Sequence, residues 1–148
     1  MELPNQLVKF ITEQSNFPIE ENIFGIHCVD ISSFGTRQYE RHNNYFSQPS
    51  GWNIFATNNM DDAFFVNFAE ETIGLPVYFV YHDRESKPCK VADSLEHFER
   101  IIKTINGRAD DFPLDLSSLN LGVDMENEFW EEMNEYFTEA ENFEDDDD

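Results

Sequence analysis

Three pairs of neighbouring acidic residues are the first candidates for chemistry in this sequence: Asp61-Asp62, Glu70-Glu71 and Asp110-Asp111. Two carboxylates that face each other across a cleft can divide the roles of general acid and general base. Neighbouring residues in an extended segment point to opposite faces, so adjacent acids make poor pairs of this kind. All three pairs also fall in polar stretches that are typical of turns. We therefore interpret them as exposed turn acids and not as catalytic groups.

Cysteine and histidine offer a second kind of chemistry, either metal binding or nucleophilic catalysis. No Cys-x-x-Cys or His-x-x-x-His spacing is present, so the sequence predicts no metal site. A hydrolase that combines Cys28 with His27 or His82 and a carboxylate stays open as an alternative. However, Cys28 lies in an apolar run, where a buried and unreactive thiol is the commoner case. Phosphate-binding loops, nucleophile elbows and dinucleotide fingerprints are absent as well. We expect a protein that is not an enzyme and that needs no cofactor.

The charge of the chain is strongly negative and unevenly distributed. Its 148 residues include 31 acids against 9 bases, which gives a formal net charge of −22, yet 40% of the residues are apolar and 15 are Phe. That apolar content suffices for the core of a single folded domain. Residues 124–148 contain 13 acids and no Lys or Arg. Such a surface argues against direct binding to nucleic acid, whose phosphates need cations, and permits a basic protein partner.

Membrane and secretion signals are not evident in the sequence. No stretch approaches the ~20 apolar residues of a transmembrane helix, and no charged-then-apolar segment opens the sequence. We therefore expect a cytoplasmic protein in which Cys28 and Cys89 are reduced thiols. The sequence predicts no membrane partner and leaves the oligomeric state open.

The stretch from Gly51 to Ile105 must position any functional surface, because its periodicity is the strongest in the chain. Three runs rich in Phe, Val, Tyr and Ile begin at Trp52, Ala63 and Pro76, and polar turns separate them. This pattern predicts a meander of antiparallel strands. The connection at residues 58–62 is expected to expose both Asp61 and Asp62, and the connection at residues 69–75 carries Glu70 and Glu71.

A helix is predicted directly after the meander. Five apolar residues fall on one helical face, and Gly107 follows them as a C-terminal cap: Leu95, Phe98, Ile101, Ile102 and Ile105. Asp93 and Glu96 have the spacing of a capping box at its start. His97 lies between two glutamates, so we expect its side chain to be exposed.

Weaker patterns precede the meander. Residues 4–14 predict a short helix and residues 16–22 a loop. Residues 23–31 predict a strand in which Gly25 suggests a bulge. Residues 32–49 are poorly patterned, and we interpret them as a loop or a short irregular helix.

A second amphipathic helix is predicted after Asp124. Met125, Phe129, Met133 and Phe137 recur every four residues, which gives an aromatic face opposite an acidic one. The leucines of the preceding segment are expected to attach it to the body: Leu114, Leu116, Leu119 and Leu121. The sequence thus divides into an α+β domain at residues 1–123 and an acidic helix with a frayed tail at residues 124–148, which packs on the same domain.

The order of these motifs resembles the SUKH superfamily, which includes fungal cell-wall regulators and many bacterial immunity proteins. The matching pieces are Gly51-Trp52, Pro76-Val77-Tyr78 and the run from Ala92 to Phe98, while Ile23 to Ile26 and Leu3-Pro4 are similar to earlier parts of the family pattern. The resemblance covers roughly residues 3–106 and leaves residues 108–148 without a counterpart. It implies an α+β fold in which a mostly antiparallel sheet is flanked by helices.

The resemblance also implies a function, namely that of an immunity protein that binds and inhibits a cognate toxin. The acid excess supports this prediction independently, because many antibacterial toxins, nucleases especially, are basic. The toxin would be occluded through an acidic surface, whose candidate residues come from the turns and the last helix: Asp61, Asp62, Glu70, Glu71, Glu128, Glu131, Glu132 and Glu135. Two alternatives stay open, a regulatory or scaffold protein like the fungal relatives and the hydrolase described above.

Overall fold

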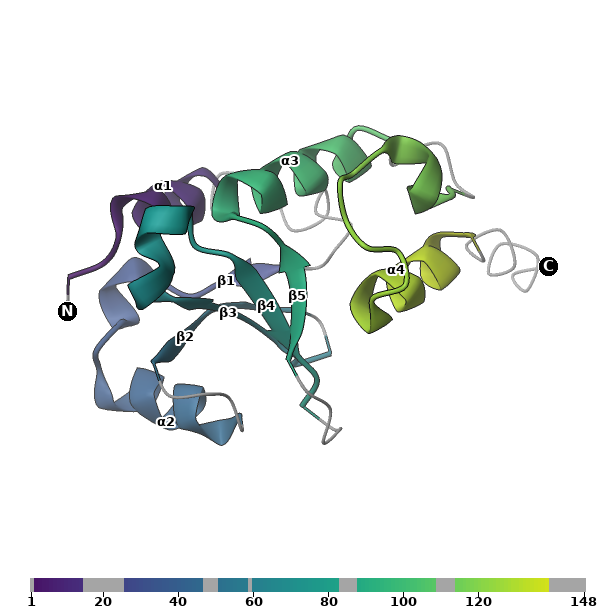
Figure 1. Cartoon of the computed structure of the whole chain (residues 1–148). Coiled ribbons are helices and arrows are strands. Elements are labelled where there is room, and N and C mark those ends of the chain that lie inside the picture. Colours follow the sequence, from purple (N-terminus) through teal and green to yellow (C-terminus); the bar gives the residue numbers. More distant parts are fainter. Residues whose placement is uncertain are drawn as a thin grey trace.

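The computed structural model describes residues 2–14, 26–46, 51–58, 60–82, 88–108 and 114–138. In these ranges five antiparallel strands form one sheet in the order β1-β2-β3-β4-β5, and helices lie around it (Figure 1). The strands are β1 (His27–Cys28), β2 (Trp52–Thr57), β3 (Ala63–Asn67), β4 (Val77–Val80) and β5 (Cys89–Ala92). The main helices are α1 (Asn5–Gln14), α2 (Arg37–Tyr45), α3 (Leu95–Asn106) and α4 (Glu128–Thr138).

This architecture confirms the predicted α+β class with an antiparallel sheet flanked by helices. Three short 3-10 helices complete the described parts of the chain: η2 (Ile31–Ser33), η3 (Phe68–Ile73) and η4 (Leu116–Leu119). The predictions for the loop at residues 16–22, for Gly25, for Asp110-Asp111 and for the tail after residue 138 lie outside the described residues.

Alternation along the strands divides the core between the two faces of the sheet. On β3, Phe64 packs against Phe98 of α3 with ring centroids 5.3 Å apart. The next residue, Phe65, points to the other face and meets Phe46 at the end of α2 at 5.6 Å. Phe10 of α1 stacks on Phe98, so α1 and α3 cover the same face (Figure 1). The period of two that predicted the strands therefore also determines which helix each strand residue contacts.

Helix α3 has the predicted apolar face but a different N-terminal cap. All five residues of that face are buried. The cap is Ser94, whose hydroxyl accepts a hydrogen bond from the His97 backbone N–H at 3.0 Å. The predicted capping box of Asp93 and Glu96 is therefore wrong by one residue. The Asp93 carboxylate instead pairs with Lys90 at 3.2 Å.

The N-terminal third differs most from the sequence predictions. β1 contains only two residues, because Asp30 accepts from the Ser32 backbone N–H and begins η2, so the predicted strand does not continue to Ile31. The poorly patterned region contains a regular helix, α2, which begins after the N-cap Thr36. Asn43 of this helix accepts from the backbone N–H of Ile54 and donates to the carbonyl of Trp52, so α2 is bound to β2.

Candidate partner-binding surface

Helix α4 presents a continuous row of glutamates. Asn127 accepts from the Phe129 backbone N–H and satisfies one donor of the first turn. Phe129 and Phe137 are buried, as their spacing predicted, and so is Trp130. The other members of the predicted repeat differ, because Met133 is half-buried and Met125 precedes the helix. The opposite side carries four acids at positions i, i+3, i+4 and i+7 of the helix: Glu128, Glu131, Glu132 and Glu135. We call these four residues the α4 acidic row.

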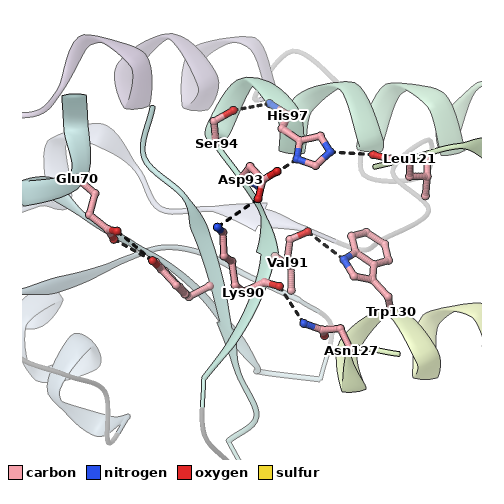
Figure 2. A network of polar contacts seen from close by, with 10 residues as sticks. Glu70, Lys90, Val91, Asp93, Ser94, His97, Leu121, Asn127 and Trp130 are labelled. Atoms are coloured by element: carbon pink, nitrogen blue, oxygen red, sulfur yellow. Dashed lines mark hydrogen bonds and ion pairs between the residues drawn. The ribbon is translucent and has the colours of Figure 1, made fainter. Parts of the chain in front are cut away.

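Polar contacts hold α4 in a fixed orientation against β5. The indole Nε1–H of Trp130 donates to the Val91 carbonyl at 2.9 Å, and the Asn127 amide donates to the Lys90 carbonyl at 2.9 Å (Figure 2). The Phe129 ring also lies 4.6 Å from that of Phe79. Because side-chain hydrogen bonds and ring packing both attach the opposite helix face, Glu128, Glu131 and Glu135 of the acidic row are exposed to solvent.

The members of the acidic row differ in their surroundings. Glu131 and Glu135 are exposed, and so is Glu128. Glu132 is half-buried, and its carboxylate accepts from the Tyr81 hydroxyl at 2.9 Å. Burial raises the pKa of the nearby Cys89 thiol, and the negative charges of Glu128 and Glu132 add to that rise against an opposing hydrogen bond from the Phe129 backbone. The negative potential of the row therefore reaches the start of β5.

The turn between β2 and β3 contributes one further exposed acid. Asp61 has a left-handed backbone with φ +64° and an exposed side chain, and the neighbouring Met60 is 68% exposed. Asp62 is only 6% exposed, so the prediction that both acids are exposed is wrong for this residue. Its carboxylate accepts from the His82 backbone N–H at 2.9 Å and contacts the His82 ring at 2.8 Å. Asp62 therefore holds the turn and cannot easily reach a partner.

The turn and the acidic row lie at the same end of the sheet. His82, which contacts Asp62, directly follows Tyr81, which donates to Glu132. The two residues Tyr81 and His82, which follow β4, thus contact both the β2–β3 turn and the α4 acidic row. Asp61 and the exposed part of the α4 acidic row belong to one acidic end of the molecule.

Glu70 and Glu71 lie at the opposite end. The β2–β3 turn precedes β3 and η3 follows it, so the length of that strand separates the two acid pairs (Figure 1). Glu71 is exposed, whereas Glu70 accepts from the Tyr78 hydroxyl at 3.0 and 3.1 Å. Burial, together with the Glu70 carboxylate, raises the pKa of Tyr78 to about 12. The predicted residues therefore form two separate surfaces.

Cys28 and His27 lie together in a pocket of about 380 Å³ that also contains His42. Burial raises the pKa of the Cys28 thiol to about 12, so the thiol is protonated at neutral pH and is a poor nucleophile. His82 is not in this pocket, because it contacts Asp62. Among the described residues, no group of three or more His, Cys, Asp or Glu side chains is placed to hold a metal ion.

His97 was predicted to be exposed, and the structure corrects this: the residue is 8% exposed. Its Nδ1 accepts from the Asp93 backbone N–H at 3.0 Å, and its Nε2 lies 2.8 Å from the Leu121 carbonyl (Figure 2). The ring joins the start of α3 to the segment that leads into α4. Its second partner lies 24 residues further along the chain, so no local sequence signal indicated this role.

No protein-family model, curated protein or solved structure matches this chain. None of the helices in the described ranges has the length and apolar character needed to span a bilayer. The case for a function therefore rests on the geometry of the surface and on the motifs in the sequence.

Proposed function

We propose that this chain is an immunity protein of the SUKH type, which binds and inhibits a basic protein toxin in the cytoplasm. The observation that carries the proposal is the α4 acidic row. Four glutamates follow one face of a helix that contains no base, while the other face of that helix is buried. The motifs from Gly51-Trp52 to Phe98 that resemble the SUKH superfamily support the class of function.

Folding alone does not require such a row. Glu128 and Glu132, like Glu131 and Glu135, are four residues apart, and like charges at this spacing destabilise a helix by a few tenths of a kcal/mol. One base in each pair would remove that penalty. Glu128 and Glu131 lie in the first turn, where the helix dipole favours acids. Glu135 has no such support, and a partner with a cationic surface would account for it.

Inhibition would proceed by occlusion. A cationic groove on the toxin would dock against the exposed carboxylates of Glu128, Glu131, Glu135 and Asp61, with Met60 beside them as an apolar contact. For a nuclease toxin, these carboxylates would occupy the positions of substrate phosphates. Charge of this kind increases the association rate and disfavours acidic partners.

The test is a protection assay with the toxin candidate encoded by the neighbouring gene. The chain and that toxin are co-expressed, growth is recorded, and association rates of the purified pair are measured across a salt series. Wild type should restore growth, and its association rate should fall steeply with salt, because the Debye length shrinks from ~10 Å at 0.1 M to ~3 Å at 1 M. Absence of both binding and protection would refute the proposed function.

A charge-matched pair of variants locates the surface. The triple variant Glu128→Lys, Glu131→Lys and Glu135→Lys spares Glu132 and its bond to Tyr81. We expect it to slow association at low salt by about tenfold or more. The control reverses three exposed acids on other elements, Glu2, Glu40 and Glu96, for the same change in net charge. Equal slowing by both variants would mean that net charge acts without a docking surface on α4.

A further inference from the structure

The pocket of about 380 Å³ beside β1 has a chemical character unlike the rest of the surface. It lies between β1 and α2, whereas α4 packs on β5 at the other side of the sheet. Cys28 and the buried Tyr39 form part of its wall, and Gln38, His42 and Thr57 add polar groups. Its volume falls in the range of small-molecule sites, at about 300–1,000 Å³.

The described residues that line this pocket include no Asp, Glu, Lys or Arg, although the chain has 31 acids and 9 bases. A phosphate or carboxylate would meet no Lys or Arg there, only the imidazoles of His27 and His42, and an ammonium group would find no carboxylate. Moving a charge into such a site without a counter-ion is unfavourable. Because the described lining lacks these four charged residue types, it favours an uncharged ligand.

Hydrogen-bonding groups in the pocket differ in their availability. The Tyr39 hydroxyl already donates to the Ile54 carbonyl at 2.8 Å, so its ring is a fixed wall. Within the described parts of the chain, the Gln38 amide and the Thr57 hydroxyl make no side-chain hydrogen bond. Gln38 thus offers an adjacent donor and acceptor, the pattern that pairs with the complementary edge of an adenine-like ring.

A flat surface lies next to this amide. Gln38 and His42 are four residues apart on α2 and therefore lie side by side on the helix. Imidazole rings stack on the faces of nucleobases, and such stacking needs no charge. The combination of a stacking ring, an amide edge and a neutral wall is suited to a heteroaromatic ring.

We propose that this pocket binds an uncharged heteroaromatic molecule of nucleobase or nucleoside size. The Gln38 amide pairs with the donor–acceptor edge of the ligand, His42 stacks on its face, and the Thr57 hydroxyl provides a further hydrogen bond. This ligand site is independent of the α4 acidic row, so it stands or fails separately from the proposed function.

The experiment is a titration of the full chain with adenosine at constant pH, followed by amide and imidazole NMR shifts. We expect saturable shifts confined to the residues that line the pocket. Gln38→Ala should weaken binding by about tenfold or more, and His42→Ala should weaken it as well. Both residues are exposed on α2, so the amide spectrum should retain its folded pattern. The matched control is Gln6→Ala, which removes an exposed amide from α1 and should leave the affinity unchanged.

Two further ligands test the chemical class. AMP adds a phosphate and should bind several-fold more weakly than adenosine, and glucose, which is uncharged but has no aromatic ring, should not produce saturable shifts. The proposal is overturned if adenosine causes no saturable shift at its solubility limit. Binding of AMP or glucose that equals or exceeds that of adenosine also overturns it, and so does an unchanged affinity in Gln38→Ala.

Discussion

Helices α3 and α4 both pack against Phe64 on one face of the sheet, yet their outer faces differ. Each buries a row of large apolar residues, with Phe98 at the centre of α3 and Phe129 and Trp130 in α4. The outer face of α3 mixes charges, and its Lys103 forms an ion pair with Glu99 at 2.7 Å. The charged residues on the outer face of α4 are all acidic, and Tyr136 and Thr138 are exposed as well. Folding therefore determines the inner faces of both helices, whereas the outer face of α4 calls for a different explanation.

The largest expected effect comes from removing α4 altogether. A chain that ends at Val123 loses the Phe129 ring that packs on Phe79 and the Trp130 ring bonded to Val91. We expect this truncation to expose apolar surface and to aggregate, as measured by light scattering after size-exclusion chromatography. A truncated chain that stays monomeric and melts like the full one would mean that α4 is an arm and not a counterpart of α3.

Truncation of one buried ring in each helix compares the two inner faces directly. Phe98→Ala in α3 and Phe129→Ala in α4 should each lower the free energy of unfolding by ~3–5 kcal/mol, because both side chains are buried in the core. Urea denaturation provides the measurement, with the exposed Glu96→Ala as the control. A loss below about 1 kcal/mol for Phe129→Ala alone would show that α4 contributes little to the fold.

Replacement of His97, which connects α3 to the segment before α4, should lower the stability of the protein. His97→Ala removes both ring contacts and leaves the Asp93 N–H and the Leu121 carbonyl without their partner in the ring. We expect the free energy of unfolding to fall by ~1–3 kcal/mol. His42→Ala removes an exposed histidine and should leave thermal and urea stability nearly unchanged. Similar small losses in both variants would contradict the role of His97 as a link between α3 and the segment before α4.

The smallest effect concerns the outer faces themselves. Glu135→Lys replaces a like-charge pair with a favourable pair between Glu131 and the introduced lysine, and it places a cation near the C-terminus of α4. The substitution should therefore stabilise the protein by a few tenths of a kcal/mol at low salt. Lys103→Glu makes the opposite change in α3 and should destabilise it. Thermal melts at low and high salt measure both effects, which should shrink as salt rises. Destabilisation by Glu135→Lys would remove the argument that the acidic row opposes helix stability.

Local periodicity predicted the parts of the fold whose structure depends on residues that are close together in the sequence. The strands, the buried face of α3 and the aromatic face of α4 all follow from repeats of two or of about 3.6 residues. The sequence left α2 undecided between a loop and a short irregular helix, because its main anchors are Tyr39 and Asn43, which bond to the backbone of β2 more than ten residues away. A tertiary contact of this kind leaves no repeat in the sequence.

The candidate surface could be predicted only in part for the same reason. Glu128, Glu131 and Glu135 are exposed as the helical pattern indicated, because the opposite face is apolar. The burial of Asp62 depends on His82, twenty residues further along the chain. Composition could indicate an acidic surface, but it could not separate the acids that face solvent from the one that holds a turn.

The bonds that Trp130 and Asn127 make to β5 also bear on how copies of this chain meet. β5 is the last strand of the sheet, and an outermost strand offers backbone groups on which a strand of another molecule can pair. The side chains of Asn127, just before α4, and of Trp130 in α4 occupy the carbonyls of Lys90 and Val91. With these two carbonyls already bonded, another strand would find fewer backbone partners at this edge, which disfavours edge-to-edge association.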